Sequence, residues 1–283
     1  CPVTAHALSG VEGVVENMPD RVYHADKTTL SSSGARLILK SPALFRHQQD
    51  NPGAYNPVFN LGHAAHTAIL SAGADVQRLE WDSYRSKDAR AERDSLLDAG
   101  ITPLLPKEWE QVADMHLACL DHPVVGPLIT RTDLVREASL FWQDAATGVP
   151  CRARPDLATA DWSLLIDYKT TVDASPAGFA KSLGNFWYHC QQAWYMDAVK
   201  HFTGRDPAFV FIAQEKTPPY LVGVYVVDQT AIELADAMNR KARLTWRRCT
   251  ETDEWPGYTP EPTVVPLPAW SEKTLTEEYI DNE

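Results

Sequence analysis

Two aspartates and a lysine within one short segment have the residue types needed for metal-assisted hydrolysis. Asp156 and Asp167 lie in the segment RPDLATADWSLLIDYKT, residues 154–170, and Lys169 follows two positions after the second aspartate. Carboxylate oxygens are the ligands that Mg²⁺ prefers, and a lysine beside them can hold a water molecule. This combination is the one expected for Mg²⁺-dependent cleavage of phosphodiester bonds.

The end of this segment predicts a strand that carries two of the three groups. Residues 162–169 contain an apolar run followed by Asp167, Tyr168 and Lys169, which is typical of a strand that reaches the edge of a core. Side chains alternate along a strand, so Asp167 and Lys169 share one face and Tyr168 points to the other. Because an unpaired buried charge is costly, a functional role is favoured over a surface ion pair.

A second strand is predicted at residues 149–157, joined to the first by a short turn. If the turn centres on Ala160 and Asp161, Asp156 pairs opposite Leu165. Asp167 is then the diagonal neighbour of Asp156 on the same face, roughly 7–8 Å away. Two carboxylates at that separation can share a divalent cation.

Arg152 and Arg154 have the same strand parity as Asp156, so the two guanidinium groups are expected on the face of the acids. Two interpretations are open. The arginines pair with the acids as part of the structure, or they hold phosphate.

His66 lies in the apolar helical run LGHAAHTAIL. A single histidine on an apolar helix is usually a core residue with its hydrogen bonds satisfied, and a ligand role is the alternative. Gly62, one turn earlier on the same face, would allow a ligand or another backbone to approach, and His63 is the competing ligand candidate.

Three further polar residues have simple structural interpretations when each is taken alone. Glu137 begins a predicted strand, where a solvated acid is the plain interpretation. Gln191 and Tyr195 are four residues apart and share a helix face, which is also expected of ordinary helix packing.

The order of predicted elements indicates one α/β domain with a mixed sheet and a helical N-terminal elaboration. An irregular segment is expected at 1–21, a single domain at 22–250 and an acidic, proline-rich tail at 251–283. Helices are predicted at 34–40, 42–49, 60–71, 87–98, from 106, at 175–182, 186–202 and 229–248, and strands at 137–143, 149–157, 162–169, 208–214 and 220–227.

Charge and cysteine usage narrow the class of protein. The net charge of −12 is unusual for a protein that binds nucleic acid, but the tail at 251–283 has nine acids and one base. The five cysteines stand singly without zinc spacing, which indicates reduced thiols in a cytoplasmic protein. No apolar stretch is long enough to span a membrane, and no signal peptide or membrane partner is expected.

Taken together, the motifs resemble the PD-(D/E)XK nuclease superfamily, and within it the RecB-like branch and the RecE-like exonucleases of the exodeoxyribonuclease VIII type. The resemblance covers roughly residues 22–270 and depends on five motifs in the expected order. They are Gly62-x-x-x-His66, Glu137, Gly148-x-x-Cys151-Arg152-x-Arg154-Pro155-Asp156, Asp167-x-Lys169-Thr170 and Tyr188-x-x-Gln191-x-x-x-Tyr195, with Leu30-Ser31-Ser32-Ser33, Ser41-Pro42-Ala43-Leu44-Phe45 and Leu267-Pro268-Ala269-Trp270 as supporting matches.

The resemblance implies a restriction-endonuclease-like fold, with a mixed sheet flanked by helices, and a set of roles. Metal ligands would be His66, Asp156, Asp167 and the Tyr168 carbonyl, with Glu137 as the weakest match. Lys169 would position or activate the attacking water, and Gln191 and Tyr195 would support the site or touch the DNA backbone. Mg²⁺ would be the cofactor, and Mn²⁺ would substitute for it.

The same resemblance implies an exonuclease that digests linear double-stranded DNA from its ends, 5′→3′. Such an enzyme would leave 3′ single-stranded tails for a RecT-like single-strand annealing protein in recombination. It would be encoded by a phage or prophage and work in the bacterial cytoplasm. The acidic net charge separately leads us to expect a homo-oligomer that encircles the DNA, with Arg152 and Arg154 contacting it. Two alternatives are an endonuclease or single-strand-specific nuclease of the same fold, and a DNA-binding module without activity.

Overall fold

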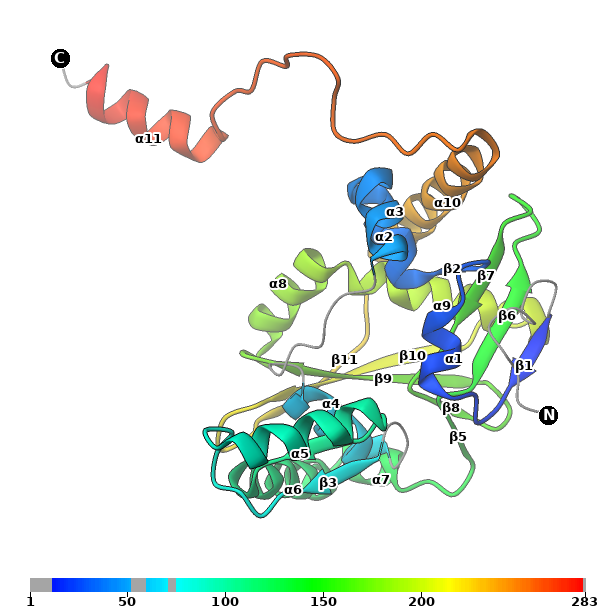
Figure 1. Cartoon of the computed structure of the whole chain (residues 1–283). Helices are drawn as coiled ribbons and strands as arrows, with labels where there is room; N and C mark the ends of the chain where they lie inside the picture. The colour runs from blue at the N-terminus through cyan, green and yellow to red at the C-terminus, as the bar shows by residue number, and fades with distance from the viewer. Residues whose placement is uncertain (1–11, 52–59, 71–74, 282–283) are drawn as a thin grey trace.

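Two β-sheets meet at the centre of the protein, as the computed structural model of residues 12–51, 60–70 and 75–281 shows (Figure 1). Residues 1–11 of the predicted N-terminal segment, Ser71 of a predicted helix and residues 282–283 of the predicted tail lie outside these ranges. The larger sheet has the strand order β11 (Val222–Tyr225), β10 (Ala208–Glu215), β9 (Leu164–Thr171), β8 (Leu157–Thr159) and β5 (Leu134–Arg136). The second sheet has the order β1 (Gly13–Val15), β6 (Ser139–Gln143), β7 (Pro150–Ala153) and β2 (Leu30–Ser31), and a small parallel pair joins β3 (Val76–Arg78) and β4 (Thr102–Leu104).

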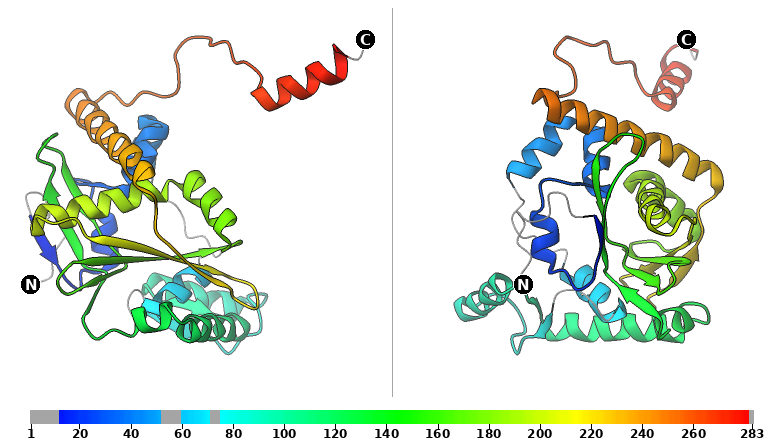
Figure 2. Two further views of the ribbon diagram at one scale, coloured as in Figure 1. Left: turned by 180° about the vertical axis from the view of Figure 1, so that it is seen from behind. Right: turned by 90° about the vertical axis from the view of Figure 1, so that its right-hand side faces the viewer.

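Helices cover both faces of the larger sheet (Figures 1 and 2). The lower group in Figure 1 is α4 (Asn60–Leu70), α5 (Lys87–Asp98), α6 (Pro106–Asp121) and α7 (Val125–Ile129). The upper group is α2 (Ser32–Lys40), α3 (Pro42–Asp50), α8 (Pro176–Phe186), α9 (Tyr188–Thr203) and α10 (Gln229–Thr252), and α1 (Asp20–Ala25) lies beside the second sheet. None of the helices in the described ranges combines the length and apolarity needed to cross a bilayer.

Each face of β9 packs into a different core. Leu165 belongs to the core formed with α2, α9 and α10, where Trp194 is fully buried. Ile166 and Tyr168 belong to the core formed with α4, α6 and α7. The alternation predicted for this strand is therefore confirmed, and Asp167 lies on the α9 side.

One hairpin runs through both sheets without a change of register. Arg136 pairs with Leu157 in the larger sheet, and Leu140 pairs with Ala153 in the second sheet. Both pairs belong to one continuous antiparallel alignment, which places residue 137 opposite residue 156. The two arms of the hairpin thus pass from one sheet to the other at the same point.

At this crossing point the β-strand is interrupted in both arms of the hairpin. Glu137 has a left-handed φ of 46° and donates its N–H to the carbonyl of Asp156 at 3.0 Å. On the other arm, Pro155 has no backbone N–H to donate to a neighbouring strand. The strand predicted over 149–157 is therefore divided into β7 and β8, with Asp156 in the gap.

The register between β8 and β9 differs from the predicted one. Ala158 pairs with Leu165, so the same alignment sets Asp156 opposite Asp167 and not opposite Leu165. The predicted diagonal arrangement was wrong by two residues because the turn is centred one residue later than expected, on Asp161 and Trp162. The Asp161 carboxylate accepts hydrogen bonds from both sides of that turn and stabilises it.

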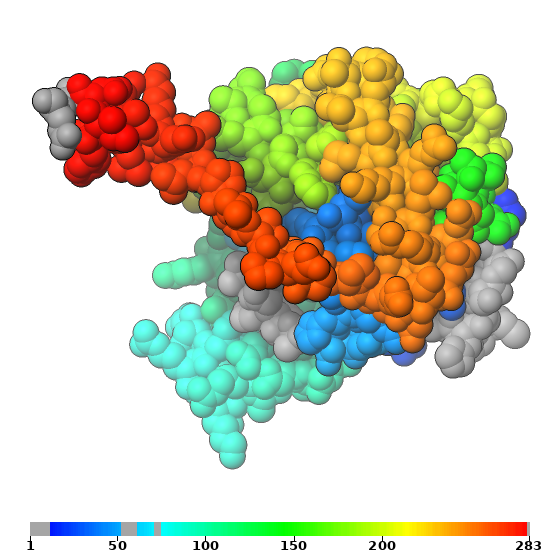
Figure 3. Space-filling model, turned by 90° about the horizontal axis from the view of Figure 1, so that it is seen from above, coloured from blue at the N-terminus to red at the C-terminus, as the bar shows by residue number. Residues whose placement is uncertain are grey.

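The C-terminal segment leaves the body of the protein after one anchoring contact. Trp255 stacks on Phe45 of α3 with ring centroids 5.6 Å apart, and Ala43 donates its N–H to the carbonyl of Pro256. Beyond this point the chain projects outward and ends in α11 (Ala269–Tyr279), which buries no residue (Figures 2 and 3). The domain limits expected at 22–250 stay a prediction.

Arg243 of α10 connects the second sheet to α9. Its guanidinium lies 3.0 Å from Asp144 in the β6–β7 loop and 2.7 Å from Asp197 of α9, and it covers the Trp194 ring at 4.4 Å. The side chain is only 6% exposed. This buried ion-pair group fixes α9 relative to the second sheet.

We expect Arg243→Ala to lower the free energy of unfolding by about 3–5 kcal/mol, because it leaves two carboxylates without their partner. Arg240→Ala, an exposed position on the same helix, should change it by less than about 0.5 kcal/mol. Urea denaturation of the three proteins measures both values. A loss in Arg243→Ala no greater than that of the control would contradict the assigned role.

Candidate active site

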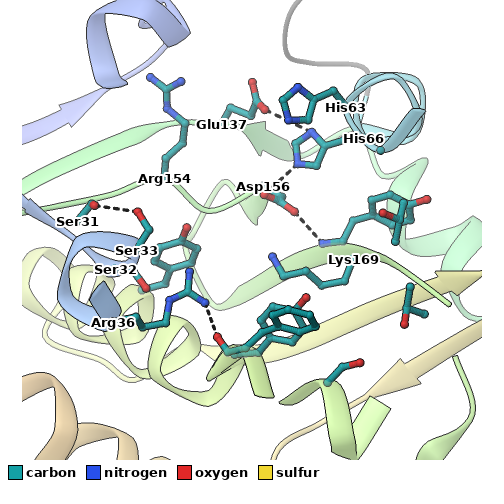
Figure 4. Close-up of a pocket in the computed structure, with 18 of the residues that line it drawn as sticks. Ser31, Ser32, Ser33, Arg36, His63, His66, Glu137, Arg154, Asp156 and Lys169 are labelled. Carbon is teal, nitrogen blue, oxygen red and sulfur yellow. Dashed lines mark hydrogen bonds and ion pairs between the residues drawn. The ribbon is translucent and has the colours of Figure 1, made fainter. Parts of the chain in front are cut away.

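A cavity of about 890 Å³ opens where the two sheets separate, and the predicted site residues gather around it (Figure 4). Its walls come from α1, α2, α4, α8 and the end of β9. Of the predicted residues, the lining contains His66, Glu137, Arg152, Arg154, Asp156, Tyr168, Lys169 and Tyr195. Asp167 and Gln191 lie directly behind this lining, bonded to it as described below.

Asp156 is fixed by the break in the hairpin. One carboxylate oxygen accepts the backbone N–H of Tyr168 at 2.7 Å, and the other lies 3.1 Å from Nε2 of His66. Burial alone would raise the pKa of Asp156, but His66, Lys169 and the Tyr168 N–H outweigh burial and hold this pKa below its usual value. Asp156 is therefore an ionised acid in a confined position.

Asp167 is the more deeply buried of the two acids, with its side chain 1% exposed. Burial, helped by the negative charge of Asp156 and opposed by Lys169, raises the pKa of Asp167 to about 6. One carboxylate oxygen accepts a hydrogen bond from Gln191 at 2.9 Å. The other lies 2.5 Å from Nζ of Lys169 in an ion pair, yet receives no well-directed hydrogen bond from any described residue.

Lys169 lies on the same face of β9 as Asp167, as the strand parity predicts. Burial alone would lower the pKa of Lys169, but the neighbouring Asp167 and Asp156 raise it. Its ammonium group is 5.2 Å from the ring centroid of Tyr188. Lys169 is thus a permanent positive charge beside the two acids.

His66 lies between Glu137 and Asp156 in the cavity wall (Figure 4). Its Nε2 faces Asp156, and its Nδ1 lies 3.6 Å from Glu137. Burial would lower the pKa of His66, but Asp156 and then Glu137 raise it. Burial raises the pKa of Glu137 in turn. The pKa of the neighbouring His63 is lowered, first by partial burial of its ring and then by the charge of His66.

The chemistry of these groups fits a divalent cation. Asp167 has a buried carboxylate oxygen whose close partner is the Lys169 ammonium group, and two more acids flank a histidine. Oxygen donors with one imidazole suit Mg²⁺ or Mn²⁺. Within the described ranges no three such side chains already converge at ligand distance. In this arrangement His66 and Lys169 balance the charge of the acids. A cation would take the place of the proton on His66.

Gln191 lies behind the cavity lining and connects Asp167 to Tyr195, which is part of the lining. The Gln191 amide donates to Asp167 and to the Tyr195 hydroxyl, at 2.9 and 3.1 Å. The helix face that these two residues share therefore helps to orient the Asp167 carboxylate, which is more than ordinary helix packing. The predicted contact of these two residues with DNA stays a prediction.

Arg152 and Arg154 lie on the cavity wall, but the structure engages both in ion pairs. Arg152 pairs with Asp26 at 3.0 Å, and Arg154 pairs with Asp20 and donates to the carbonyl of Met18. Both guanidinium groups also cover the Tyr23 ring, at 5.1 and 4.1 Å. Their partners are in and around α1, not the acids of the site. Their predicted role in DNA binding stays a prediction.

Sequence reasoning missed the residues on the far side of the cavity. Arg36, Lys181 and Lys216 add positive charge to the lining, and Ser32 and Ser33 come from the start of α2. The serines at 31–33 are helix-cap candidates by type and also belong to the family resemblance, and Ser31 is the cap. No local pattern indicated that this helix start would face Asp156.

The raised pKa of Asp167 predicts a specific pH dependence of stability. Its folded-state value of about 6 lies above that of an unfolded aspartate, so its neutral form stabilises the metal-free protein below about pH 4. This contribution is lost as the pH rises through about 6 and amounts to as much as about 3 kcal/mol.

We therefore expect the unfolding free energy of the metal-free wild type to fall between pH 4 and pH 7 relative to that of Asp167→Asn, which has no group to ionise. The exposed Asp82→Asn serves as the matched control. Parallel pH curves for wild type and Asp167→Asn in chelator would contradict the assignment.

Comparison with known proteins identifies one family and one well-matched fold. The sequence profile of the family described as “PDDEXK-like domain of unknown function” matches residues 31–263. The crystal structure of a Eubacterium rectale protein named “Putative exonuclease” has a TM-score of 0.62 to this chain at 11% sequence identity, covering 96% of this chain and 99% of that chain. The crystal structure of SSO0001 aligns with 66% of this chain and 87% of that chain at 11% identity, with a TM-score of only 0.28. No curated protein matches the chain.

These findings confirm the predicted restriction-endonuclease-like mixed sheet with flanking helices. The family match spans most of the chain and includes every residue that we placed at the site. With Asp156, Asp167 and Lys169 assembled at one break in the sheet, the chain belongs to the PDDEXK-like family of the PD-(D/E)XK nuclease superfamily.

Proposed function

We propose that the protein is a divalent-metal-dependent deoxyribonuclease that hydrolyses phosphodiester bonds of linear double-stranded DNA. The observation that carries this proposal is the convergence of Asp156, Asp167 and Lys169, with His66 facing the first acid. Two acids and a histidine can hold a hard cation, and a fixed ammonium group beside them can orient water.

Each residue has a separate task in this proposal. Asp156, Asp167 and His66 hold the cation, with the Tyr168 carbonyl and Glu137 as further candidates, and Gln191 keeps Asp167 in its orientation. The cation, Mg²⁺ with Mn²⁺ as a substitute, would neutralise charge that builds up on the phosphate oxygens. Lys169 holds the attacking water and stabilises the developing negative charge. The sugar 3′-oxygen leaves, so the products carry 5′-phosphates.

End-dependent action is the finer part of the proposal. The motif resemblance to RecE-like exonucleases supports it, and the structurally similar Eubacterium rectale protein has the name of an exonuclease. An acidic chain with a net charge of −12 has little general attraction for DNA. Enclosure of a DNA end by a homo-oligomer would compensate for that weakness. Digestion 5′→3′ would then supply 3′ tails to a single-strand annealing protein in a bacterial host.

We expect linear duplex to be degraded in Mg²⁺ while a covalently closed circle of the same sequence stays intact. Label on the 5′ strand ends should be released before label on the 3′ ends. Asp167→Asn should lose at least about a thousandfold in rate, because it removes a ligand on which the chemical step depends. Rapid nicking of the circle would indicate an endonuclease instead. Earlier loss of 3′ label would reverse the polarity.

His66→Ala should weaken Mn²⁺ binding by about tenfold or more, because it removes a nitrogen ligand and leaves Asp156 without its partner. His63→Ala, three positions earlier on the same helix, is the matched control and should bind Mn²⁺ like the wild type. Calorimetric titration of each metal-free protein gives the affinities. Equal losses in the two variants would show that His66 is not the ligand.

A further inference from the structure

The first turn of α2 forms a wall of the cavity apart from the two acids. Figure 4 shows Ser32 and Arg36 on one side and Asp156 and Lys169 on the other. The first backbone N–H groups of a helix have no intrahelical acceptor, and this end has partial positive charge. The turn can therefore attract an anion, although a helix start alone does not define a binding site.

Neighbouring contacts hold this turn in place. Ser31 pairs in parallel with Arg152 of β7, and its hydroxyl caps the helix by accepting the N–H of Gly34 at 3.1 Å. Gly34 packs so closely that a Cβ atom there would lie 3.0 Å from the ring of Phe45. The turn is thus positioned by the second sheet and by α3 before any ligand arrives.

Ser32 supplies the independent sign of a ligand. Its side chain lines the cavity and is only 5% exposed, yet its hydroxyl has no hydrogen-bond partner among the described residues. Buried hydroxyl groups are nearly always paired, because the loss of water is otherwise uncompensated. Helix capping does not explain this serine, since Ser31 already has that task.

Arg36 lies one helical turn after Ser32, on the same face of α2. One of its nitrogens donates to the carbonyl of Phe186 at 2.8 Å, which fixes the guanidinium at the cavity. Arg152 and Arg154 each form an ion pair with a carboxylate. Arg36 forms no ion pair with any carboxylate among the described residues. Its remaining N–H donors and its full charge are therefore available to an anion.

We propose that the start of α2 is a phosphate-binding subsite, in which the Ser32 hydroxyl, the first-turn N–H groups and the Arg36 guanidinium bind one phosphate of the DNA. This inference extends the proposed nuclease function and is separate from the metal-binding acids. Such a subsite holds a strand at a second point while the bond to be cut lies at Asp156 and Lys169. It also adds attraction for an anion on the side of the cavity away from the acids.

Ser32→Ala tests the subsite without disturbing the fold. The substitution removes no hydrogen bond from the protein, so the melting temperature should not fall. Binding of a fluorescent linear duplex in Ca²⁺, used as a non-cleaving ion, should weaken by about tenfold to a hundredfold, as expected for one hydrogen bond to a charged group. Ser41→Ala is the matched control, because Ser41 is buried, outside the cavity and bonded to Pro256. It should bind duplex like the wild type. Unchanged duplex affinity of Ser32→Ala would overturn the proposal.

Arg36→Gln tests the charge of the subsite through the salt dependence of binding. Loss of one phosphate contact should reduce the slope of log affinity against log salt by about 0.9 for duplex DNA. Arg36→Lys, which keeps the charge, should retain the slope even if its affinity falls. Identical slopes for wild type and Arg36→Gln would overturn the role of Arg36.

Two kinds of phosphate could occupy the subsite, and the ends of the duplex distinguish them. A Ser32→Ala defect seen only with 5′-phosphorylated duplex would assign a terminal phosphate. An equal defect with 5′-hydroxyl duplex would assign an internal phosphodiester. A wild type that binds duplex without cleaving it in Mg²⁺ would contradict the nuclease proposal alone, because the Ca²⁺ binding comparison still decides the subsite. A wild type that binds neither duplex would overturn the subsite as well.

Discussion

The site depends on an interruption of the strands that the two arms of one hairpin share, at Glu137 on one arm and at Asp156 on the other. At this point the Glu137 N–H binds the Asp156 carbonyl, and the Asp156 carboxylate accepts the Tyr168 N–H. The Asp156 side chain thus accepts a hydrogen bond from the backbone of β9 at the place where strand pairing is interrupted. Because the sheet holds this N–H group in place, the hydrogen bond also holds the Asp156 carboxylate in place. The same interruption separates the two sheets and opens the cavity between them.

Burial of several charges follows from this geometry and explains the pairing around the cavity. Two acids face each other across the break, which is unfavourable unless cations stand nearby. His66 and Lys169 supply that positive charge in the metal-free protein. These two ion pairs balance the charge of the acids, and in the proposed nuclease a divalent cation would take over that task. Gln191 contributes no charge and fixes the orientation of Asp167.

The arginines around the cavity show how one residue type divides between structure and binding. Arg152 and Arg154 join the second sheet to α1 through Asp26 and Asp20, and both cover Tyr23. Their charge is already matched, so they stabilise the wall of the cavity. Binding of an anion requires positive charge that the protein has not already paired. The start of α2 offers such charge, on the side of the cavity away from the acids.

The sequence by itself determined the local part of this arrangement. Alternation along β9 set Asp167 and Lys169 on one face, and helical spacing set Gln191 and Tyr195 on another, since both periods are properties of the backbone. The tertiary structure decided the rest. A two-residue shift in the partner of Asp156 cannot be resolved from composition, so the position of Asp156 opposite Asp167 was decided by where the turn lies in the folded protein. The partners of Arg152 and the orientation of Ser32 toward the cavity involve residues more than a hundred positions apart. Such contacts depend on how whole elements pack, which no local pattern encodes.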